Sequence, residues 1–452
     1  MRITNKQQWH MEPPRGLLND PNGLSWFNDK YYVFFQWNRF GKNHKNKEWG
    51  FFTSPDLVHW TFQGSALLPD QPYDENGVYS GSAYVIDGNL YMYYTGNNKC
   101  NGIRTSSQCL AVSNDGIRFI KHGPIFNTPK GYTQHFRDPR IIPGKNENYF
   151  MLIGAQRDNG KGGIVLLNSK DGKLWEMNGL LAKTEEWQMV ECPDYFEIDN
   201  TGILLYCPQH RDNEADKVVD SVALFKITKL HDDSSKLEDS DLDNNYQTVD
   251  KGFDFYSPQT MGTPDGRRVL IGWMSRMDET QEEIFSKNEP RIHCLTMPRE
   301  VLFKNGHLIQ RPVKELYELL GQSIQGNIDG EKIVFSNISR CFHLSVDLKD
   351  CQRAKQIKIH SDEWRFEYNS ENKTGLFARN SWVSESEEIR LFNLESFENI
   401  EIWSDNSSLE IFINGGQDVL SSRIFPKTDV LSLCIEGAGL YSSVQLNEIL
   451  TV

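Results

Sequence analysis

The fold is decided by the stretch Tyr31-Tyr32-Val33-Phe34-Phe35, an aromatic run that returns at a steady interval up to residue 273. The later copies are Leu90-Tyr91-Met92-Tyr93-Tyr94, Tyr149-Phe150-Met151-Leu152-Ile153, Ile203-Leu204-Leu205-Tyr206 and Val269-Leu270-Ile271-Gly272-Trp273. Aromatic and β-branched residues favour strands, and copies spaced about one blade apart are typical of repeat architectures. The five copies therefore predict a five-bladed β-propeller.

A second repeat runs in phase with the aromatic one and reads Ser-x-Asp-x-x-x-aromatic. Its copies are Ser54-Pro55-Asp56-Leu57-Val58-His59-Trp60, Ser113-Asn114-Asp115-Gly116-Ile117-Arg118-Phe119 and Ser169-Lys170-Asp171-Gly172-Lys173-Leu174-Trp175. Each copy follows an aromatic strand. The pattern predicts hairpin turns closed by an aromatic strand residue.

The pattern changes after residue 311. A helix is predicted between Pro312 and Gly321, because proline favours a helix start and glycine a helix end. Alternating strands follow, among them Phe342–Leu348 and Leu409–Asn414, and they predict a β-sandwich. The sequence thus predicts an all-β protein with a five-bladed β-propeller over residues 1–311, a helical linker over 312–325 and a β-sandwich over 326–452.

The octet Gly16-Leu17-Leu18-Asn19-Asp20-Pro21-Asn22-Gly23 lies directly before the first aromatic run. Pro21 fixes its own φ and restricts Asp20 to extended conformations. The Asp20 carboxylate is therefore presented in a defined direction. A plain turn is the alternative interpretation, because asparagine, aspartate, proline and glycine are the residues that turns favour.

Two further acids stand in proline-bearing tripeptides, Arg137-Asp138-Pro139 and Glu191-Cys192-Pro193. A propeller gathers the starts of its innermost strands around a central channel, so Asp20, Asp138 and Glu191 are expected to converge there. Two carboxylates on either side of a glycosidic bond are what a glycosidase needs. Any one of these acids could instead be a loop carboxylate that caps backbone N–H groups.

The formal net charge of -14 opposes binding to nucleic acid or to anionic membranes, and favours a small-molecule sugar as the partner. The amino terminus lacks an apolar run of signal-peptide length, and no run is long enough to span a bilayer. The eight cysteines lack metal-ligand spacing and are expected to be free thiols. A cytoplasmic monomer or homodimer without a metal is predicted.

The motifs resemble those of glycoside hydrolase family 32, the β-fructosidases that include invertases and sucrose-6-phosphate hydrolases. The resemblance spans the chain and rests on Asn19-Asp20-Pro21-Asn22-Gly23, Phe35-Gln36-Trp37-Asn38, Trp49-Gly50, Tyr79-Ser80-Gly81-Ser82, Arg137-Asp138-Pro139, Glu191-Cys192-Pro193, Asp254-Phe255-Tyr256-Ser257-Pro258-Gln259 and Gly272-Trp273-Met274. The chain departs from the family at Leu17-Leu18, where Trp-Met is common, and at Phe51, where histidine is common.

The resemblance implies Asp20 as the nucleophile, Glu191 as the general acid/base and Asp138 as the carboxylate that stabilises the transition state. It implies a substrate site formed by Asn19, Gln36, Trp49, Tyr79, Ser80, Arg137 and Trp273. The implied activity is a retaining β-fructofuranosidase that acts on sucrose 6-phosphate or sucrose without a cofactor. The alternatives are an exo-acting fructan hydrolase and a catalytically silent sugar-binding propeller. The Asp20 and Glu191 motifs argue against an arabinanase-like enzyme.

The run Arg39-Phe40-Gly41-Lys42-Asn43-His44-Lys45-Asn46-Lys47 is basic within an acidic chain. It lies between the Gln36 and Trp49 motifs, so it is expected beside the pocket. Its four fixed cations, Arg39, Lys42, Lys45 and Lys47, are predicted to hold a substrate phosphate through charge-assisted hydrogen bonds. A solvated basic loop is the alternative.

Overall fold

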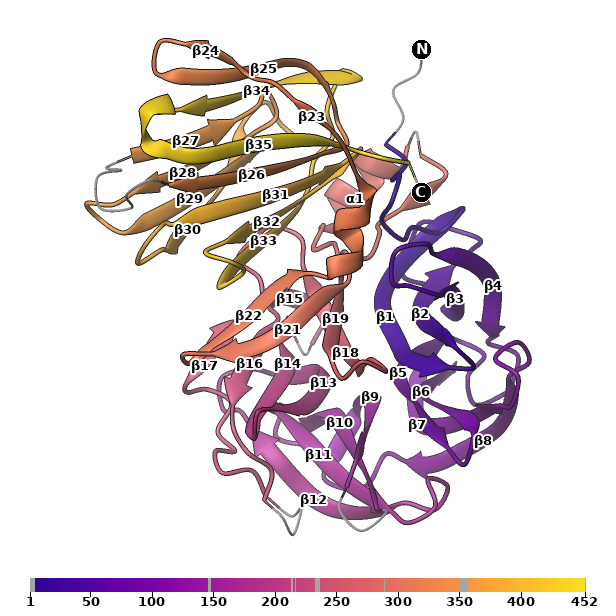
Figure 1. The fold of residues 1–452 in the computed structure, drawn as a ribbon. Helices are drawn as coiled ribbons and strands as arrows, with labels where there is room; N and C mark the ends of the chain where they lie inside the picture. The colour runs from indigo at the N-terminus through magenta and orange to yellow at the C-terminus, as the bar shows by residue number, and fades with distance from the viewer. Residues whose placement is uncertain are drawn as a thin grey trace. The chain divides into compact units, whose positions relative to one another are not determined.

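The computed structural model describes residues 5–144, 148–212, 214–215, 217–231, 236–287, 289–348 and 356–451 (Figure 1). In this part of the chain the elements are strands β1 to β35, one α-helix and two short 3-10 turns. The prediction of an all-β protein is confirmed. Among the described residues, no helix has the length and the apolar run that crossing a membrane requires.

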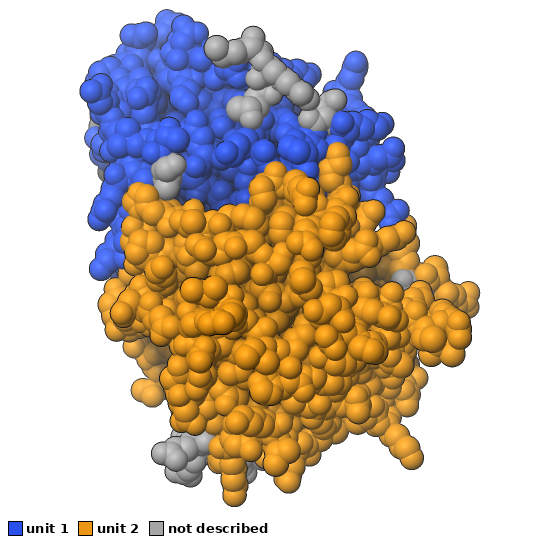
Figure 2. Space-filling view, turned by 90° about the vertical axis from the view of Figure 1, so that its right-hand side faces the viewer, with its two compact units in different colours: residues 1–12, 250–255, 274–452 blue, residues 13–249, 256–273 orange. Residues whose placement is uncertain are grey.

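The chain forms two compact units, which Figure 2 shows in different colours. Unit 2 consists of residues 13–249 and 256–273, and unit 1 consists of residues 1–12, 250–255 and 274–452. Each unit has a core of its own.

Unit 2 is built from antiparallel sheets of consecutive strands. The first two contain β1 (Gly16–Phe27), β2 (Lys30–Asn38), β3 (Glu48–Ser54) and β4 (Thr61–Leu67), then β5 (Val78–Ile86), β6 (Asn89–Cys100), β7 (Ile103–Ser113) and β8 (Ile120–Asn127). The third contains β9 (Tyr132–Pro143), β10 (Tyr149–Arg157), β11 (Gly162–Ser169) and β12 (Glu176–Lys183). The fourth contains β13 (Met189–Ile198), β14 (Thr201–Asp212), β15 (Lys217–Ser221), β16 (Leu224–Ile227) and β17 (Tyr246–Thr248). The pair β18 (Tyr256–Gly262) and β19 (Arg268–Trp273) completes the unit.

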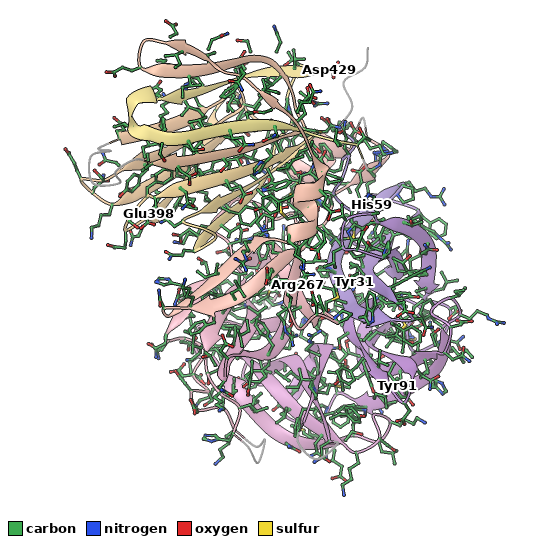
Figure 3. The ribbon with its side chains drawn as sticks, viewed as in Figure 1. Tyr31, His59, Tyr91, Arg267, Glu398 and Asp429 are labelled. Carbon is green, nitrogen blue, oxygen red and sulfur yellow. The ribbon has the colours of Figure 1, made fainter. Side chains whose placement is uncertain are left out.

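The first strands of these five groups close into a ring. Strand β1 packs against β5 and β18, β5 against β9, β9 against β13, and β13 against β18. The five aromatic runs form the second strands β2, β6, β10, β14 and β19, as predicted. Tyr31 and Tyr91, labelled in Figure 3, lie on the first two of them and are buried.

The Ser-x-Asp turns are also confirmed. They connect β3 to β4, β7 to β8 and β11 to β12. In the first turn, Asp56 Oδ1 accepts hydrogen bonds from the backbone N–H groups of Val58 at 3.0 Å and His59 at 2.8 Å. Asp115 and Asp171 make the equivalent bonds in the other two turns. The aspartate thus satisfies backbone donors that the turn leaves without a ladder partner.

Each of the five inner strands carries a bulge against its neighbour. The register shifts fall between Leu18 and Pro21, Val78 and Gly81, Arg137 and Arg140, Glu191 and Asp194, and Tyr256 and Gln259. Asp138, Cys192 and Ser257 have positive φ values of 65°, 46° and 50° at these bulges. A bulge bends its strand and re-aims a side chain, so the repeated bulge turns selected side chains out of the sheet pattern.

Unit 1 contains a hairpin, β21 (Arg299–Lys304) with β22 (His307–Pro312), and two larger antiparallel sheets. The six-stranded sheet has the order β23 (Leu320–Ile324), β35 (Tyr441–Ile449), β26 (Phe342–Leu348), β31 (Asn399–Asp405), β32 (Ser408–Ile413) and β33 (Asp418–Arg423). The seven-stranded sheet has the order β24 (Asn327–Asp329), β25 (Lys332–Ser339), β34 (Val430–Glu436), β27 (Gln356–His360), β28 (Trp364–Asn369), β29 (Thr374–Asn380) and β30 (Glu387–Asn393). One hydrophobic core holds side chains from both, including Leu344 and Ile402 from the first and Phe366 and Phe377 from the second.

The predicted helix after Pro312 is a 3-10 turn rather than an α-helix. Turn η1 (Lys314–Leu319) is held by i to i−3 bonds such as Leu316 N–H to Val313 O at 3.0 Å, and strand β23 begins directly at Leu320. Sheet pairing of β23 therefore limits the helical segment to six residues.

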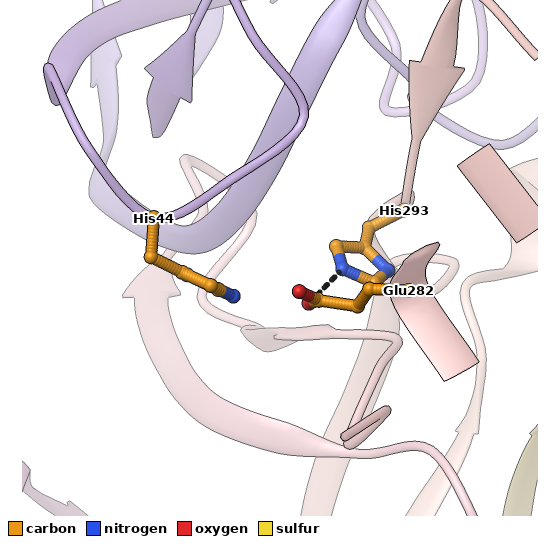
Figure 4. A group of neighbouring side chains, drawn as sticks. All are labelled: His44, Glu282 and His293. Atoms are coloured by element: carbon orange, nitrogen blue, oxygen red, sulfur yellow. Dashed lines mark hydrogen bonds and ion pairs between the residues drawn. The ribbon is translucent and has the colours of Figure 1, made fainter. Parts of the chain in front are cut away.

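Helix α1 (Glu279–Ser286) was not predicted, because its short polar sequence shows little apolar periodicity. It begins with a capping box formed by Asp278 and Gln281. The two-residue strand β20 (Arg291–Ile292) follows helix α1. The buried Glu282 carboxylate lies 2.8 Å from Nε2 of His293. Figure 4 marks this contact with a dashed line.

Candidate active site

Asp20 lies on β1 at the end of a chain of hydrogen bonds. The Ser80 hydroxyl donates to Asp20 Oδ2 at 2.5 Å, and Gln36 Nε2 donates to the same hydroxyl. Asn19 Nδ2 donates to Gln36 Oε1 at 3.1 Å. The Lys47 ammonium in turn donates to Asn19 Oδ1. Every donor in this chain points towards Asp20, so a buried cation at one end faces the carboxylate at the other.

Asn22 fixes the bulge that presents Asp20. Its Nδ2 donates to the Asp20 carbonyl at 3.1 Å, and its Oδ1 accepts from the Gly81 N–H at 3.0 Å. The first bond closes a local turn around Pro21. The second ties β1 to the bulge of β5, next to Ser80, so the two inner strands hold one another in register.

Glu191 is held by three side chains from three other strands. Arg137 donates to Glu191 Oε1 from Nε at 2.9 Å and from Nη2 at 2.6 Å. Tyr256 donates to Oε2 at 3.0 Å, and Gln209 Nε2 donates to the same oxygen. Burial alone would lower the pKa of Arg137, but the charges of Glu191 and Asp138 outweigh it and raise that pKa. Arg137 is therefore a permanent cation between the two acids.

Asp138 lies deepest of the three acids. Its Oδ2 accepts hydrogen bonds from the Cys192 N–H at 3.1 Å and from the Cys192 thiol at 3.6 Å. Burial, and then the negative charge of Glu191, raise the pKa of Asp138 to about 7, with a smaller contribution from Asp20. Arg137, the residue before Asp138, pairs with Glu191, and Cys192, the residue after Glu191, donates to Asp138, so these two acids lie side by side.

The structure adds Gln209, Tyr256 and Ser257, which the sequence did not single out as site residues, and it places Cys192, the residue after Glu191, in contact with Asp138. The Cys192 thiol lies 2.7 Å from the Ser257 hydroxyl, and burial raises the pKa of this thiol well above its ordinary value. Cys192 thus stays protonated beside Asp138. A signal for Ser257 was present, because Tyr256-Ser257-Pro258 repeats the residue-proline pattern of the Asp20, Asp138 and Cys192 motifs.

Both tryptophans of the predicted substrate site, Trp49 and Trp273, are buried. Trp49 is 0% exposed in the core, and its indole N–H donates to the Tyr79 carbonyl at 3.0 Å. Trp49 therefore stabilises the β5 bulge through this hydrogen bond. Trp273 is 9% exposed and packs edge-on against Tyr256 and His44. Trp273 therefore helps to place a tyrosine that contacts Glu191.

The four cations of the basic run 39–47 do not share one environment. Arg39 Nε lies 3.4 Å from Glu48 Oε2, so Arg39 is already paired. Lys47 is buried and lies 3.3 Å from Nδ1 of His44 in addition to its bond to Asn19. Lys45 is exposed, and Lys42 is half-buried.

Two family profiles match most of this chain. The profile of the glycosyl hydrolases family 32 N-terminal domain matches residues 10–312, and that of the family's C-terminal domain matches residues 339–448. A sucrose-6-phosphate hydrolase of Klebsiella pneumoniae is 36% identical over 429 residues, covering 93% of this chain and 88% of the relative. The sucrose-6-phosphate hydrolase of Bacillus subtilis is 34% identical and covers 93% of this chain and 89% of the relative.

Solved structures show the same similarity. The sucrose-6-phosphate hydrolase of Lactobacillus gasseri has a TM-score of 0.87 at 28% identity, over 99% of this chain and 93% of that chain. A Bombyx mori β-fructofuranosidase in complex with sucrose has a TM-score of 0.84 at 25% identity, over 99% of this chain and 94% of that chain. Profile matches over both parts of the chain, relatives above 30% identity and these structures lead to one conclusion: the chain belongs to glycosyl hydrolase family 32.

Proposed function

We propose that this protein is a retaining β-fructofuranosidase that hydrolyses the terminal β-D-fructofuranosyl bond of sucrose 6-phosphate, and of sucrose more slowly. The observation that carries the proposal is that Asp20, Asp138 and Glu191 all lie at bulges of inner strands of one ring, β1, β9 and β13. Relatives named sucrose-6-phosphate hydrolases match nearly the whole chain, which favours the phosphorylated substrate.

In the first step, an Asp20 oxygen attacks the anomeric carbon of fructose. The bond from that carbon to the glucosyl oxygen breaks, and the leaving oxygen takes a proton from Glu191. In the second step, Glu191 takes a proton from water, and the resulting hydroxide displaces Asp20 from the same carbon. Two displacements at one carbon retain its configuration, which requires the two carboxyl groups to lie about 5–5.5 Å apart.

Asp138 has a separate role in this mechanism. Positive charge develops on the fructose ring as the glycosidic bond breaks, and a fixed carboxylate nearby stabilises it. Such a carboxylate also accepts hydrogen bonds from fructose hydroxyls. The bonds from Cys192 hold Asp138 ready without reorganisation. Arg137 balances the charge that Asp138 and Glu191 bring to the site.

For the architecture, we propose that residues 1–311 form a five-bladed β-propeller and residues 326–452 a β-sandwich. The ring of β1, β5, β9, β13 and β18 supports the first part, and the core shared by two sheets supports the second. The two family profiles divide the chain at similar positions, residues 10–312 and 339–448. A monomer or homodimer is proposed for the assembly.

The substrate phosphate is proposed to lie against Lys42 and Lys45, beside the end of the hydrogen-bonded chain at Lys47. Arg39 is left out of the predicted set because Glu48 already neutralises it. Lys47 instead serves the fructose pocket through Asn19. A cytoplasmic location is proposed with this substrate, because sugars imported by phosphorylating uptake systems reach the enzyme already phosphorylated.

The test compares kcat/KM for sucrose 6-phosphate and sucrose in the wild type and in a Lys42→Ala/Lys45→Ala variant. The wild type is expected to prefer sucrose 6-phosphate, and the variant to lose about tenfold for that substrate alone, because each charge-assisted hydrogen bond contributes roughly 1.5–3 kcal/mol at best. A Lys130→Ala/Lys170→Ala variant removes the same charge from exposed positions of unit 2 and serves as the control. Equal losses for both substrates in the first variant would refute the phosphate assignment.

A further inference from the structure

The inner strands of unit 2 border a second cavity, separate from the three acids. Its volume is about 830 Å³, which lies within the range of small-molecule sites. Each inner strand contributes to it a few residues after its bulge, as in Ala83 after Ser80 and Thr260 after Ser257. Three residues along a strand span about 10 Å, so the cavity lies at the opposite end of the ring from the acids.

This cavity, which we call the distal pocket, is lined by two arginines, Arg140 and Arg268, and the buried Asp194 carboxylate pairs with the first of them. Arg140 Nε lies 2.7 Å from Asp194 Oδ1, and Arg140 Nη2 donates to the Thr260 carbonyl at 2.7 Å. The other oxygen of Asp194 accepts from the Thr260 N–H and hydroxyl, both at 2.8 Å. The Asp194 carboxylate is therefore engaged by Arg140 through an ion pair and by Thr260 through two hydrogen bonds.

The second arginine, Arg268, has no ion-pair partner among the described residues. Among the described residues its guanidinium has one hydrogen bond, to the Thr260 hydroxyl at 3.3 Å, and no carboxylate within ion-pair distance. It lies over the Phe196 ring, 5.1 Å from the ring centre. Burial lowers the pKa of Arg268, with only partial compensation from Asp194. Since a guanidinium stays charged in proteins, the pocket holds a cation without a carboxylate in direct contact.

Aromatic side chains line the wall of the distal pocket, among them Trp26, Tyr84 and Phe150. Trp26 is held edge-on by Tyr31, whose ring centre is 4.6 Å away. The rim adds the cation Lys229 and the exposed carboxylate Glu197, which accepts the Tyr195 hydroxyl at 2.9 Å. A rigid aromatic wall suits the apolar face of a sugar ring, and the arginine fork suits a phosphate.

We propose that the distal pocket is a second ligand site that binds a hexose phosphate, with the phosphate on Arg268 and the sugar ring on the aromatic wall. A phosphate would supply the anion that Asp194 cannot. The site shares no residue with the catalytic machinery. Its occupancy therefore does not depend on whether the protein hydrolyses sucrose 6-phosphate.

The test measures binding of glucose 6-phosphate, glucose and inorganic phosphate to the whole protein by isothermal titration calorimetry. Glucose 6-phosphate is expected to bind more tightly than either fragment. Arg268→Gln is expected to weaken its binding at least about tenfold, the loss of one charge-assisted bond. The control is Arg267→Gln, which removes the same charge from the neighbouring residue. Arg267 Nε pairs with Asp265 at 2.7 Å, and Arg267 does not line the pocket. This control is expected to bind like the wild type.

A second variant keeps the test decisive if Arg268→Gln folds poorly. Val85→Glu places a carboxylate in the pocket from a side chain that is already partly exposed, and it is expected to repel the phosphate. Loss of glucose 6-phosphate binding in Lys42→Ala/Lys45→Ala but not in Val85→Glu would place the ligand at the catalytic site and overturn the proposal. Equal affinity for inorganic phosphate and glucose 6-phosphate would overturn the assignment to a sugar phosphate.

Discussion

At the scale of single residues, the site is a set of charges that other side chains hold in place. Asp20 receives the chain of donors that begins at Lys47, and Glu191 receives Arg137, Tyr256 and Gln209. Neither acid packs in the hydrophobic core. Chemistry and folding stability are therefore separable at these two positions.

Replacing either acid is expected to remove activity and leave the fold intact. Asp20→Ala and Glu191→Ala should each lower kcat for sucrose 6-phosphate by about 10²–10⁴-fold or more, because general acid catalysis alone contributes that range. Fructose release measures activity, and circular dichroism with thermal melting checks the fold. Near-native turnover in either folded variant would contradict the assigned role.

The ionised Asp138 carboxylate is expected to be needed for activity and to lower the free energy of unfolding. Its folded pKa of about 7 lies above the unfolded value of 3.8, so the folded state keeps a proton that the unfolded state has lost between these pH values. Stability is therefore lost as pH rises from about 4 to 7. Asp138→Asn is neutral at every pH and should melt a few degrees above the wild type at pH 8, with no difference near pH 4, while activity is lost. A melting point at pH 8 at or below that of the wild type would refute this.

At the scale of elements, the repeated bulge is the device that builds the site. In four inner strands the bulge contains a proline, which supplies no N–H to the ladder. These prolines are Pro21, Pro139, Pro193 and Pro258. In the fifth inner strand, β5, the position of this proline is taken by Gly81, which follows Ser80. A Cβ there would collide with the carbonyl oxygen of Tyr93 on β6. The close approach of β6 explains glycine at this bulge.

Gly81→Ala is expected to destabilise the protein by about 1–3 kcal/mol, the usual cost of overpacking. It should also lower activity, because the neighbouring Ser80 donates to Asp20. Thermal unfolding and fructose release are the measurements. Gly262→Ala, at the end of inner strand β18, is the matched control, since a Cβ there meets nothing within 4 Å. If both variants melt together, the close contact with Tyr93 does not select glycine.

At the scale of the molecule, unit 1 joins the two ends of the chain through buried charges. Asp405 Oδ2 accepts from the backbone N–H groups of Trp9 at 3.1 Å and His10 at 3.2 Å. The His10 ring lies between Asp405 at 3.0 Å and Glu410 at 2.8 Å, and Glu410 also pairs with Arg299 at 2.5 Å. All four side chains are buried. Removing one member of such a network leaves an unpaired buried charge, which typically costs 3–5 kcal/mol.

This network predicts a stability maximum in mildly acidic solution. Burial alone would lower the pKa of His10, but its bonds to Asp405 and Glu410 raise it above 6.5, so its contribution is complete below pH 6.5 and is lost as pH rises through the folded value. Burial opposes ionisation of Asp405 and Glu410, but His10 and Arg299 lower both pKa values, so their contribution is lost as pH falls below about 4.

Thermal melting of the wild type across pH 4 to 9 measures this profile. His10→Gln is expected to melt below the wild type at pH 6 and to show a smaller decline between pH 6 and 9. His59→Gln is the control, because His59 pairs with Asp56 on the surface of unit 2. An unchanged alkaline decline in His10→Gln would show that another group titrates there.

The sequence by itself determined what is local or periodic. The aromatic runs, the Ser-x-Asp turns and the strands at 342–348 and 409–414 were predictable, because strand and turn preferences act over a few residues. The acids were predictable from proline-bearing tripeptides and the family resemblance. Helix α1 was missed, and the helix after Pro312 was assigned too long, because capping and sheet pairing override weak periodicity there.

Tertiary structure alone decided which distant side chains meet. Gln209 and Tyr256 reach Glu191 because β13, β14 and β18 pack together, and nothing in their local sequence marks them. The same holds for the burial of Trp49 and the pairing of Arg39 with Glu48. The distal pocket exists only because five strands far apart in sequence close a ring. Such proximity depends on how whole sheets pack together. Strand and turn preferences act over only a few residues, so they do not determine it.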